Sequence, residues 1–233
     1  MTVNPVRHQS VFDPNTFGPR RVDVIGCGAT GSRVALSLAK LGVEHLHLWD
    51  FDTVEGHNLA NQCFGVSDIG KNKAEALRDR ILSEVDTAVS AHSVRAEGTE
   101  LFGDVVFLLT DTMESRRQIW ERGIKLKPRV QLMIETRMGV DVGRVYAVQP
   151  TLSGHIKAWE ETLYASDEAV RSACGTSVTV GPTADILAGY AVWQFVRWHA
   201  ILNGGEGSLD NELVFAVYPL TVFNRTFQSF VRS

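Results

Sequence analysis

The sequence predicts an α/β fold built on a doubly wound mixed sheet. Three observations predict it: a short β-branched run that leads through a glycine-rich turn into a helix, an alternation of strand-like and helical segments, and further β-like segments after a long apolar helix. Such alternation is typical of a sheet covered by helices on both faces. We expect all 233 residues to form one domain.

The first unit is a strand, a turn and a helix. Residues 22–25 are β-branched and should form a strand, and Val34, Leu38 and Leu41 lie at helical spacing in the segment that follows. Between them, residues 26–31 have the pattern G-x-G-x-x-G. At a strand-to-helix turn such glycines let a phosphate approach backbone N–H groups and the positive end of a helix. The pattern predicts a Rossmann-like nucleotide site, with a tight turn that binds no ligand as the alternative.

The second strand, expected at residues 46–49, ends in a carboxylate. Asp50 lies where such folds place an acid that accepts hydrogen bonds from ribose hydroxyls. Asp52, Asn58 and Lys73 follow. An Asn amide both donates and accepts hydrogen bonds, and a Lys ammonium is a point charge suited to a triphosphate. Taken singly, Asn58 could equally be a turn residue and Lys73 a solvated lysine on a helix surface.

Later segments continue the alternation. We expect helices at residues 73–85, 114–122 and 178–202, and strands at 90–95, 104–109, 130–134, 213–218 and 221–231. The long apolar segment at 178–202 contains Asp185, Arg197 and His199, so we interpret it as a buried core helix and not as a membrane span. The last two strands form an additional C-terminal β segment.

Together these residues resemble the ThiF/MoeB family, the adenylyltransferases of the ubiquitin-activating type. The resemblance extends over about residues 22–199 and is carried by residues 26–32, 50–54, 58–62 and 70–73, by Thr110-Asp111-Thr112 with Arg116, and by residues 174–182. It implies ATP-dependent adenylation of the C-terminal carboxylate of a small ubiquitin-like or sulfur-carrier protein, or of a peptide, with release of pyrophosphate. It also implies a homodimer and a mobile crossover loop at residues 151–172 that closes over the partner's tail, with a solvated acidic helix as the alternative for that segment.

The resemblance assigns roles position by position. Asp50 corresponds to the ribose-binding acid, Asn58 and Lys73 to phosphate-binding residues, and Asp111 to the carboxylate that holds Mg²⁺. A carboxylate that attacks an α-phosphate meets a like charge, which positive groups and a metal must offset. The ATP-binding residues expected on this basis are Gly26, Gly28, Ala29, Thr30, Gly31, Asp50, Asp52, Asn58, Lys73 and Thr110. The catalytic residues expected are Asp111, Lys73, Cys174 and Arg7.

The chain departs from the family pattern at a phosphate-binding position. Asn61 stands where the family usually has an arginine before glutamine, and Thr112 stands where it has an asparagine. Arg7, Arg20 and Arg21 are the candidates to supply the missing charge. The segment around Arg7 resembles one whose arginine reaches the neighbouring subunit's ATP site, although a mobile basic terminus is the plainer interpretation.

Cysteine usage gives a second departure. The chain has three cysteines and no C-x-x-C pair, so we expect no structural zinc. Cys174 corresponds to a position where some family members take up the activated carboxyl group or sulfur, and a small buried packing residue is the alternative. Cys27 and Cys63 are expected to be structural.

Composition limits the partners. The net charge is −4, 21% of the residues are charged, and the sequence contains no basic block that would favour binding to nucleic acid. Unpatterned cysteines and an N-terminus without an apolar signal segment favour a cytoplasmic protein with no membrane association.

Three functions remain open from the sequence. The first is the adenylating enzyme. The second is a non-catalytic member that binds nucleotide as a scaffold or as half of a heterodimer, which Asn61 and Thr112 favour. The third is an NAD-dependent oxidoreductase, which explains Gly26 to Asp50 but leaves Asn58 and Lys73 unexplained.

Overall fold

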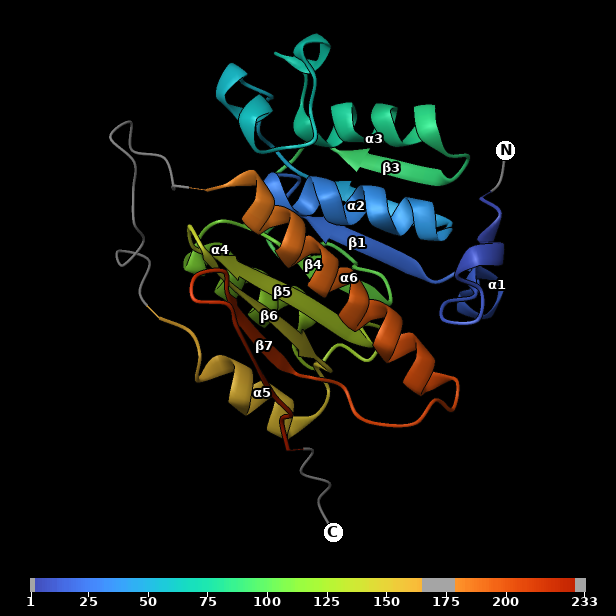
Figure 1. Ribbon diagram of the computed structural model, residues 1–233, viewed down its shortest axis with the longest axis vertical. Coiled ribbons are helices and arrows are strands. Elements are labelled where there is room, and N and C mark those ends of the chain that lie inside the picture. Colours follow the sequence, from blue (N-terminus) through green and yellow to red (C-terminus); the bar gives the residue numbers. More distant parts are fainter. Residues whose placement is uncertain (1–2, 165–178, 229–233) are drawn as a thin grey trace.

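The computed structural model describes residues 3–164 and 179–228, which form one eight-stranded sheet with helices on both faces (Figure 1). The strands are β1 (Arg21–Ile25), β2 (His45–Trp49), β3 (Ala88–His92), β4 (Val105–Leu108), β5 (Leu132–Met138), β6 (Val142–Val148), β7 (Glu212–Ala216) and β8 (Thr221–Arg225). The α-helices are α1 (Pro14–Phe17), α2 (Ala29–Leu41), α3 (Lys73–Glu84), α4 (Met113–Ile119), α5 (Ser153–Glu160) and α6 (Gly181–Leu202). Short helical turns are η1 (Pro5–Arg7), η2 (Gly56–Ala60), η3 (Val66–Asp68) and η4 (Trp120–Ile124).

The strand order reverses direction at β1. The order is β3-β2-β1-β4-β5-β6-β7-β8, with β1 to β5 parallel and β5 to β8 paired antiparallel. The chain runs outward from β1 through β2 to β3 and then returns to the other side of β1 to form β4. Ligands of open α/β sheets bind outside the carboxyl ends of the strands at such a reversal. The fold therefore places the candidate site at the ends of β1, β2 and β4.

Alternate residues of the central strands supply two separate cores. In β4, Val105 and Phe107 pack with residues of α2, α3 and α6, whereas Val106 and Leu108 belong to a second cluster with residues of α4, η4 and α5. All four side chains are fully buried, as expected where successive side chains point to opposite faces of a sheet covered on both sides. Figure 1 shows α2 and α6 side by side across the first face.

Helix α2 links the sheet to the glycine loop. Its apolar face, which includes Val34 and Leu38, is buried against the sheet and α6. The helix ends at Gly42, whose φ of +92° is the left-handed conformation that glycine adopts without strain. The rigid packing of α2 fixes the position of its N-terminus at the end of β1.

Helix α6 agrees with the long core helix expected from the sequence, although it begins at Gly181 with Pro182 in its first turn. Phe195 is fully buried, but Trp193 is 59% exposed, so Trp193 is not a core residue of the single chain. Within residues 3–164 and 179–228, no helix is long and apolar enough to cross a membrane.

The doubly wound mixed sheet and the additional C-terminal strands are confirmed, but several elements differ from expectation. Strand β3 begins and ends earlier than residues 90–95, and β8 ends at Arg225. The antiparallel strand β6 was not predicted, and its partner β5 continues to Met138 instead of ending at residue 134.

The expectation of a mobile crossover loop is wrong for the first part of residues 151–172. Helix α5 lies there, and it is not a solvated helix either, because Trp159 on its inner face is fully buried against the second core cluster. The rest of the expected loop, from residue 165, lies outside the described residues.

Candidate active site

The glycine loop is a close contact between the end of β1 and the start of α2. A Cβ atom on Gly31 would lie 1.8 Å from the carbonyl oxygen of Gly26, and one on Gly26 would lie 2.6 Å from the oxygen of Leu109. A Cβ atom on Gly28, by contrast, would meet nothing within 4 Å. Two glycines are therefore required by packing, whereas Gly28 leaves open space beside the first turn of α2, where backbone N–H groups are available to an anion.

Asp50 is tied directly to this loop. Its Oδ2 accepts a hydrogen bond from the backbone N–H of Cys27 at 2.7 Å, and its Oδ1 accepts one from the N–H of Asp52 at 2.9 Å. Burial raises the pKa of the Asp50 carboxyl group, while these two N–H donors and nearby Lys73 act in the opposite direction. The acid at the end of β2 is thus fixed against the turn at the end of β1.

Lys73 lies next to the Asp50 loop, whereas Asn58 is held within its own helical turn, η2. Lys73 begins α3, is only 8% exposed, and places its Nζ 3.1 Å from Oδ2 of Asp52. Its position is set by Asn72, which caps α3 and also donates from Nδ2 to the carbonyl oxygen of Asp50 at 2.9 Å. Asn58 is buried in η2, where its Oδ1 accepts from the N–H of Glu55 at 2.8 Å.

Thr110 and Asp111 lie next to the glycine loop, at the end of β4. The preceding residue, Leu109, donates its N–H to the carbonyl oxygen of Ile25 at 2.8 Å. Asp111 is exposed and makes no hydrogen bond or ion pair with other described residues. Thr110 Oγ1 is buried and has no hydrogen-bond partner among them. The Asp111 carboxylate and the Thr110 hydroxyl are therefore both available to a ligand, on the side of the glycine loop opposite Asp50.

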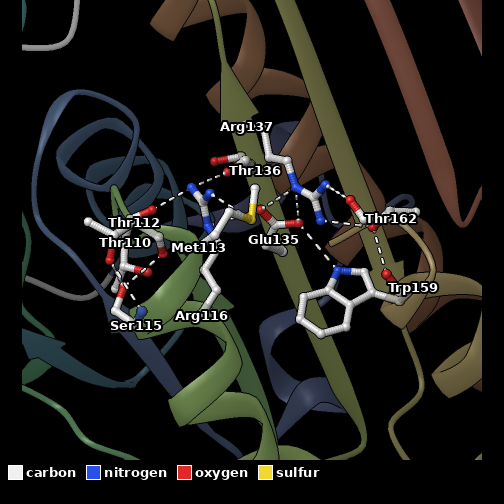
Figure 2. Close-up of polar contacts among 10 residues, drawn as sticks. All are labelled: Thr110, Thr112, Met113, Ser115, Arg116, Glu135, Thr136, Arg137, Trp159 and Thr162. Carbon is white, nitrogen blue, oxygen red and sulfur yellow. Dashed lines mark hydrogen bonds and ion pairs between the residues drawn. The ribbon is translucent and has the colours of Figure 1, made fainter. Parts of the chain in front are cut away.

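A buried charge cluster lies next to Thr110 at the end of β4 (Figure 2). The Glu135 carboxylate, fully buried in β5, accepts from Arg137 Nε at 3.0 Å and lies 3.1 Å from Arg116 Nε. Arg116 also donates to the carbonyl oxygens of Thr110 and Thr136. Sequence reasoning noted Arg116 but missed Glu135 and Arg137, although two charged residues within an apolar strand were the available signal.

The same cluster extends to the end of the first described range. Arg137 donates from NH1 to the carbonyl oxygen of Thr162 at 2.7 Å and from NH2 to its Oγ1 at 2.9 Å. Trp159 Nε1 donates to Oε2 of Glu135 at 3.3 Å. One carboxylate thus connects the Thr110 loop, through Arg116, with the segment that leads into residue 165 (Figure 2).

Two of the arginines expected to compensate for Asn61 are in the wrong place. Arg21 is the first residue of β1, and its side chain pairs with Asp23 at 2.8 Å. Arg20, one residue earlier, donates to the carbonyl oxygen of Phe17 at 2.5 Å. A five-residue strand separates them from the glycine loop, roughly 15 Å at the usual rise per residue. They cannot reach a nucleotide bound at the opposite edge.

Arg7 is also distant from the site within its own chain. It ends η1, and the next residue, His8, lies 3.2 Å from the carbonyl oxygen of Leu41 at the far end of α2. Its expected role involves a neighbouring subunit and stays a prediction. Cys174 lies outside the described residues, so its role also stays a prediction. Cys27 is fully buried and burial raises the pKa of its thiol, which favours a structural role.

The residues present fit ATP and a magnesium ion. The open space at Gly28 and the unpaired Oγ1 of Thr110 suit a polar ligand, and Asp111 offers a free carboxylate. Within the described ranges, no group of three or more His, Cys, Asp or Glu side chains could hold a metal by itself. A magnesium ion here would need phosphate oxygens and water as its other ligands, which is usual for this ion.

Comparison with known proteins decides the family. A profile of the ThiF family matches residues 17–228. The chain belongs to the ThiF family. Probable adenylyltransferase/sulfurtransferase MoeZ of Mycobacterium tuberculosis is 44% identical over 83 residues, which are 33% of this chain and 21% of that protein. Sulfur carrier protein ThiS adenylyltransferase of Escherichia coli is 28% identical over 197 residues, covering 80% of this chain and 73% of that one.

The fold of this ThiF-family chain is shared with solved structures. Escherichia coli MccB, crystallised with ATP, superposes with a TM-score of 0.69 over 94% of this chain and 67% of that chain, at 18% identity. At this identity the likeness concerns the fold alone. The chain spans about a fifth of the length of MoeZ. The names of the curated relatives confirm the resemblance to adenylyltransferases drawn from the motifs.

Proposed function

We propose that this protein uses ATP to adenylate the C-terminal carboxylate of a small ubiquitin-like or sulfur-carrier protein, or of a peptide, and releases pyrophosphate. One observation carries the proposal: the glycine loop, the Asp50–Lys73 region and Asp111 lie at the ends of adjacent parallel strands, around open space at Gly28. A nucleotide-binding turn alone would not need the lysine or the second acid.

The chemistry follows from the charges at this edge. The incoming carboxylate oxygen forms a bond to the α-phosphorus, and the bond from the α-phosphorus to the bridging oxygen of pyrophosphate breaks. The N–H groups at the start of α2 and the ammonium of Lys73 would bind phosphate oxygens, and Asp50 would accept from the ribose hydroxyls. Magnesium held at Asp111 would supply further positive charge against the like-charge repulsion.

A homodimer is part of the proposal. Arg7 lies too far from the glycine loop of its own chain to serve it, so its expected role requires a second copy. The exposed apolar side chains of Ile186 and Trp193 on α6 offer a surface for such a contact. The oligomeric state in solution, with and without the Arg7 side chain, tests this part.

A non-catalytic role is the second candidate, and one observation favours it. Asn61 supplies no cation because its amide side chain is uncharged, and that amide donates to Thr179 Oγ1. A chain short of phosphate-binding charge could bind nucleotide without reacting. In that case it would act as a scaffold or as half of a heterodimer.

Exchange of labelled pyrophosphate into ATP separates the two candidates. The assay needs the chain, magnesium and a candidate partner ending in a free glycine carboxylate, with the same partner amidated at its C-terminus as the matched control. Exchange that requires the free carboxylate and disappears in Asp111→Asn supports adenylation. Nucleotide binding without exchange, for each partner tried, favours the scaffold.

A further inference from the structure

Arg33 is a cation held beside the glycine loop, and the sequence motifs of the site do not include it. It lies in the second turn of α2, and its side chain folds back so that NH1 donates to the carbonyl oxygen of Ala29 at 2.9 Å. The same nitrogen donates to the carbonyl oxygen of Asn61 at 2.6 Å, and Nε pairs with Asp185. The guanidinium therefore joins the start of α2, the end of η2 and the start of α6.

This location is electrostatically unfavourable for a cation without an anion nearby. The first turn of a helix carries the positive end of its dipole, so a guanidinium there meets a charge of its own sign. Its carboxylate partner, Asp185, has a side chain that is 63% exposed. Water and salt screen an ion pair whose carboxylate is this exposed, so the pair contributes little to stability. The arginine can exchange Asp185 for a phosphate oxygen at little cost.

Asn61 stands where the family has its phosphate-binding arginine, and its contacts bring Arg33 to that place. The Asn61 side chain is directed to Thr179, while its carbonyl oxygen accepts from Arg33. Asn61 itself therefore carries no charge, but its carbonyl oxygen orients the guanidinium group of Arg33, which comes from α2. The positive charge beside the end of η2 thus comes from α2 and not from position 61.

Three other arginines, Arg116, Arg137 and Arg80, are engaged elsewhere. Arg116 and Arg137 are both paired with the buried Glu135. Arg80 donates to the carbonyl oxygen of Cys63 at 3.0 Å, but it extends from the exposed face of α3 and also lies 3.4 Å from Glu84. Arg33 has the contacts with both the first turn of α2 and the end of η2.

We propose that Arg33 binds the outer phosphates of ATP and replaces the arginine absent at position 61. This inference rests on the proposed function, because it concerns the same nucleotide. A guanidinium presents parallel N–H donors that match two phosphate oxygens, so it suits this role better than a point charge. The Arg33 guanidinium lies beside Ala29, which is a residue of the loop. Asp50, on the other side of the loop, would hold the ribose.

Calorimetric titration of the whole chain with magnesium-ATP and with AMP tests the inference. Arg33→Ala should weaken ATP binding about tenfold or more, as expected for losing a charged hydrogen bond. AMP lacks the outer phosphates, so its affinity should be unchanged. Arg80→Ala is the matched control, because it removes an arginine that also bonds a carbonyl near η2, and it should bind both ligands like the wild type. In the double variant Arg33→Ala, Asn61→Arg, the new side chain should restore ATP affinity.

The outcomes separate this inference from the proposed function. Equal ATP affinity of Arg33→Ala and wild type, or equal weakening of ATP and AMP, overturns the role of Arg33 and leaves the adenylation proposal standing. If the wild-type chain binds neither nucleotide, both fail. Selective loss of ATP affinity, reversed by Asn61→Arg, supports the inference even if no exchange activity is found.

Discussion

Glu135 and Arg116 form an ion pair inside the protein, with Oε1 of the glutamate 3.1 Å from Nε of the arginine. The Glu135 side chain is fully buried and Arg116 is nearly so. Because Arg116 also donates to the carbonyl oxygen of Thr110, this pair fixes the loop that carries Asp111 relative to β5. The position of the exposed Asp111 therefore depends on the buried charges of Glu135 and Arg116.

Replacing Glu135 should therefore destabilise the whole fold. Glu135→Ala leaves two buried guanidinium groups without their carboxylate, which typically costs about 3–5 kcal/mol in the free energy of unfolding. Denaturant unfolding measures the loss. Glu97→Ala is the control, because its pair with Arg122 is exposed and should contribute less than about 1 kcal/mol. Equal effects of the two substitutions would contradict a structural role for the buried cluster.

Two glycines of the loop should respond in opposite ways. Gly31→Ala places a Cβ atom 1.8 Å from the Gly26 carbonyl oxygen, so it should cost at least about 3 kcal/mol of stability. Gly28→Ala meets no atom within 4 Å and should unfold like the wild type, yet its methyl group occupies the space assigned to phosphate. Thermal unfolding and ATP titration, done on both variants, check this. A Gly28→Ala variant with normal ATP affinity would place the nucleotide elsewhere.

Asp111→Asn should affect the reaction and not the fold. The side chain is exposed and unpaired among the described residues, so the free energy of unfolding should change by less than about 0.5 kcal/mol. Loss of the magnesium-holding charge should lower pyrophosphate exchange about 100-fold. Glu114→Gln removes the same charge from an exposed position on α4 and should leave exchange unchanged. Exchange that survives Asp111→Asn would exclude the assigned role.

Acid should weaken the contact between α6 and the N-terminal segment, where the His199 ring lies against the rings of Phe12 and Phe17. Burial lowers the pKa of His199, and its Nε2 lies 3.1 Å from the amide nitrogen of Asn203, which can only donate. The folded state therefore holds His199 neutral while the unfolded chain takes up a proton below about pH 6.5. Stability is complete above that pH and falls below it, by at most about 1.4 kcal/mol per pH unit for this group. Denaturant unfolding of wild type and His199→Gln at pH 7.5 and 5.5 measures the difference, and equal pH dependence would contradict the assignment.

Local sequence patterns predicted the half of the fold that carries the glycine loop. The run before Gly26 and the helical spacing of Val34 and Leu38 depend on neighbours in the sequence, so periodicity is sufficient to place β1 and α2. Strand β6 was missed although a sequence signal was present, because the three-residue connection that begins at Gly139 is typical of a β-hairpin. A helix at α5 was only the alternative for its segment, and its burial was missed because Trp159 becomes a core residue only when packed against Trp120.

The residues of the candidate site also fall into two groups, those that the sequence could predict and those that it could not. Asp50 follows β2 directly and Asp111 comes three residues after the end of β4, so their shared edge could be predicted from the parallel order. Arg33 and Glu135 could not be assigned, because decisive partners of both lie on other elements: Asn61 and Asp185 for Arg33, and Arg116 for Glu135. The same limit explains the wrong choice of Arg20 and Arg21, which have the right charge at the wrong end of β1.

The most direct test of the central claim is a crystal structure of the protein with ATP and magnesium. The account predicts the triphosphate at the first turn of α2 beside Gly28, the ribose hydroxyls on Asp50, and the metal on Asp111. A nucleotide bound away from the end of β1, or a metal ion held without Asp111, would contradict it.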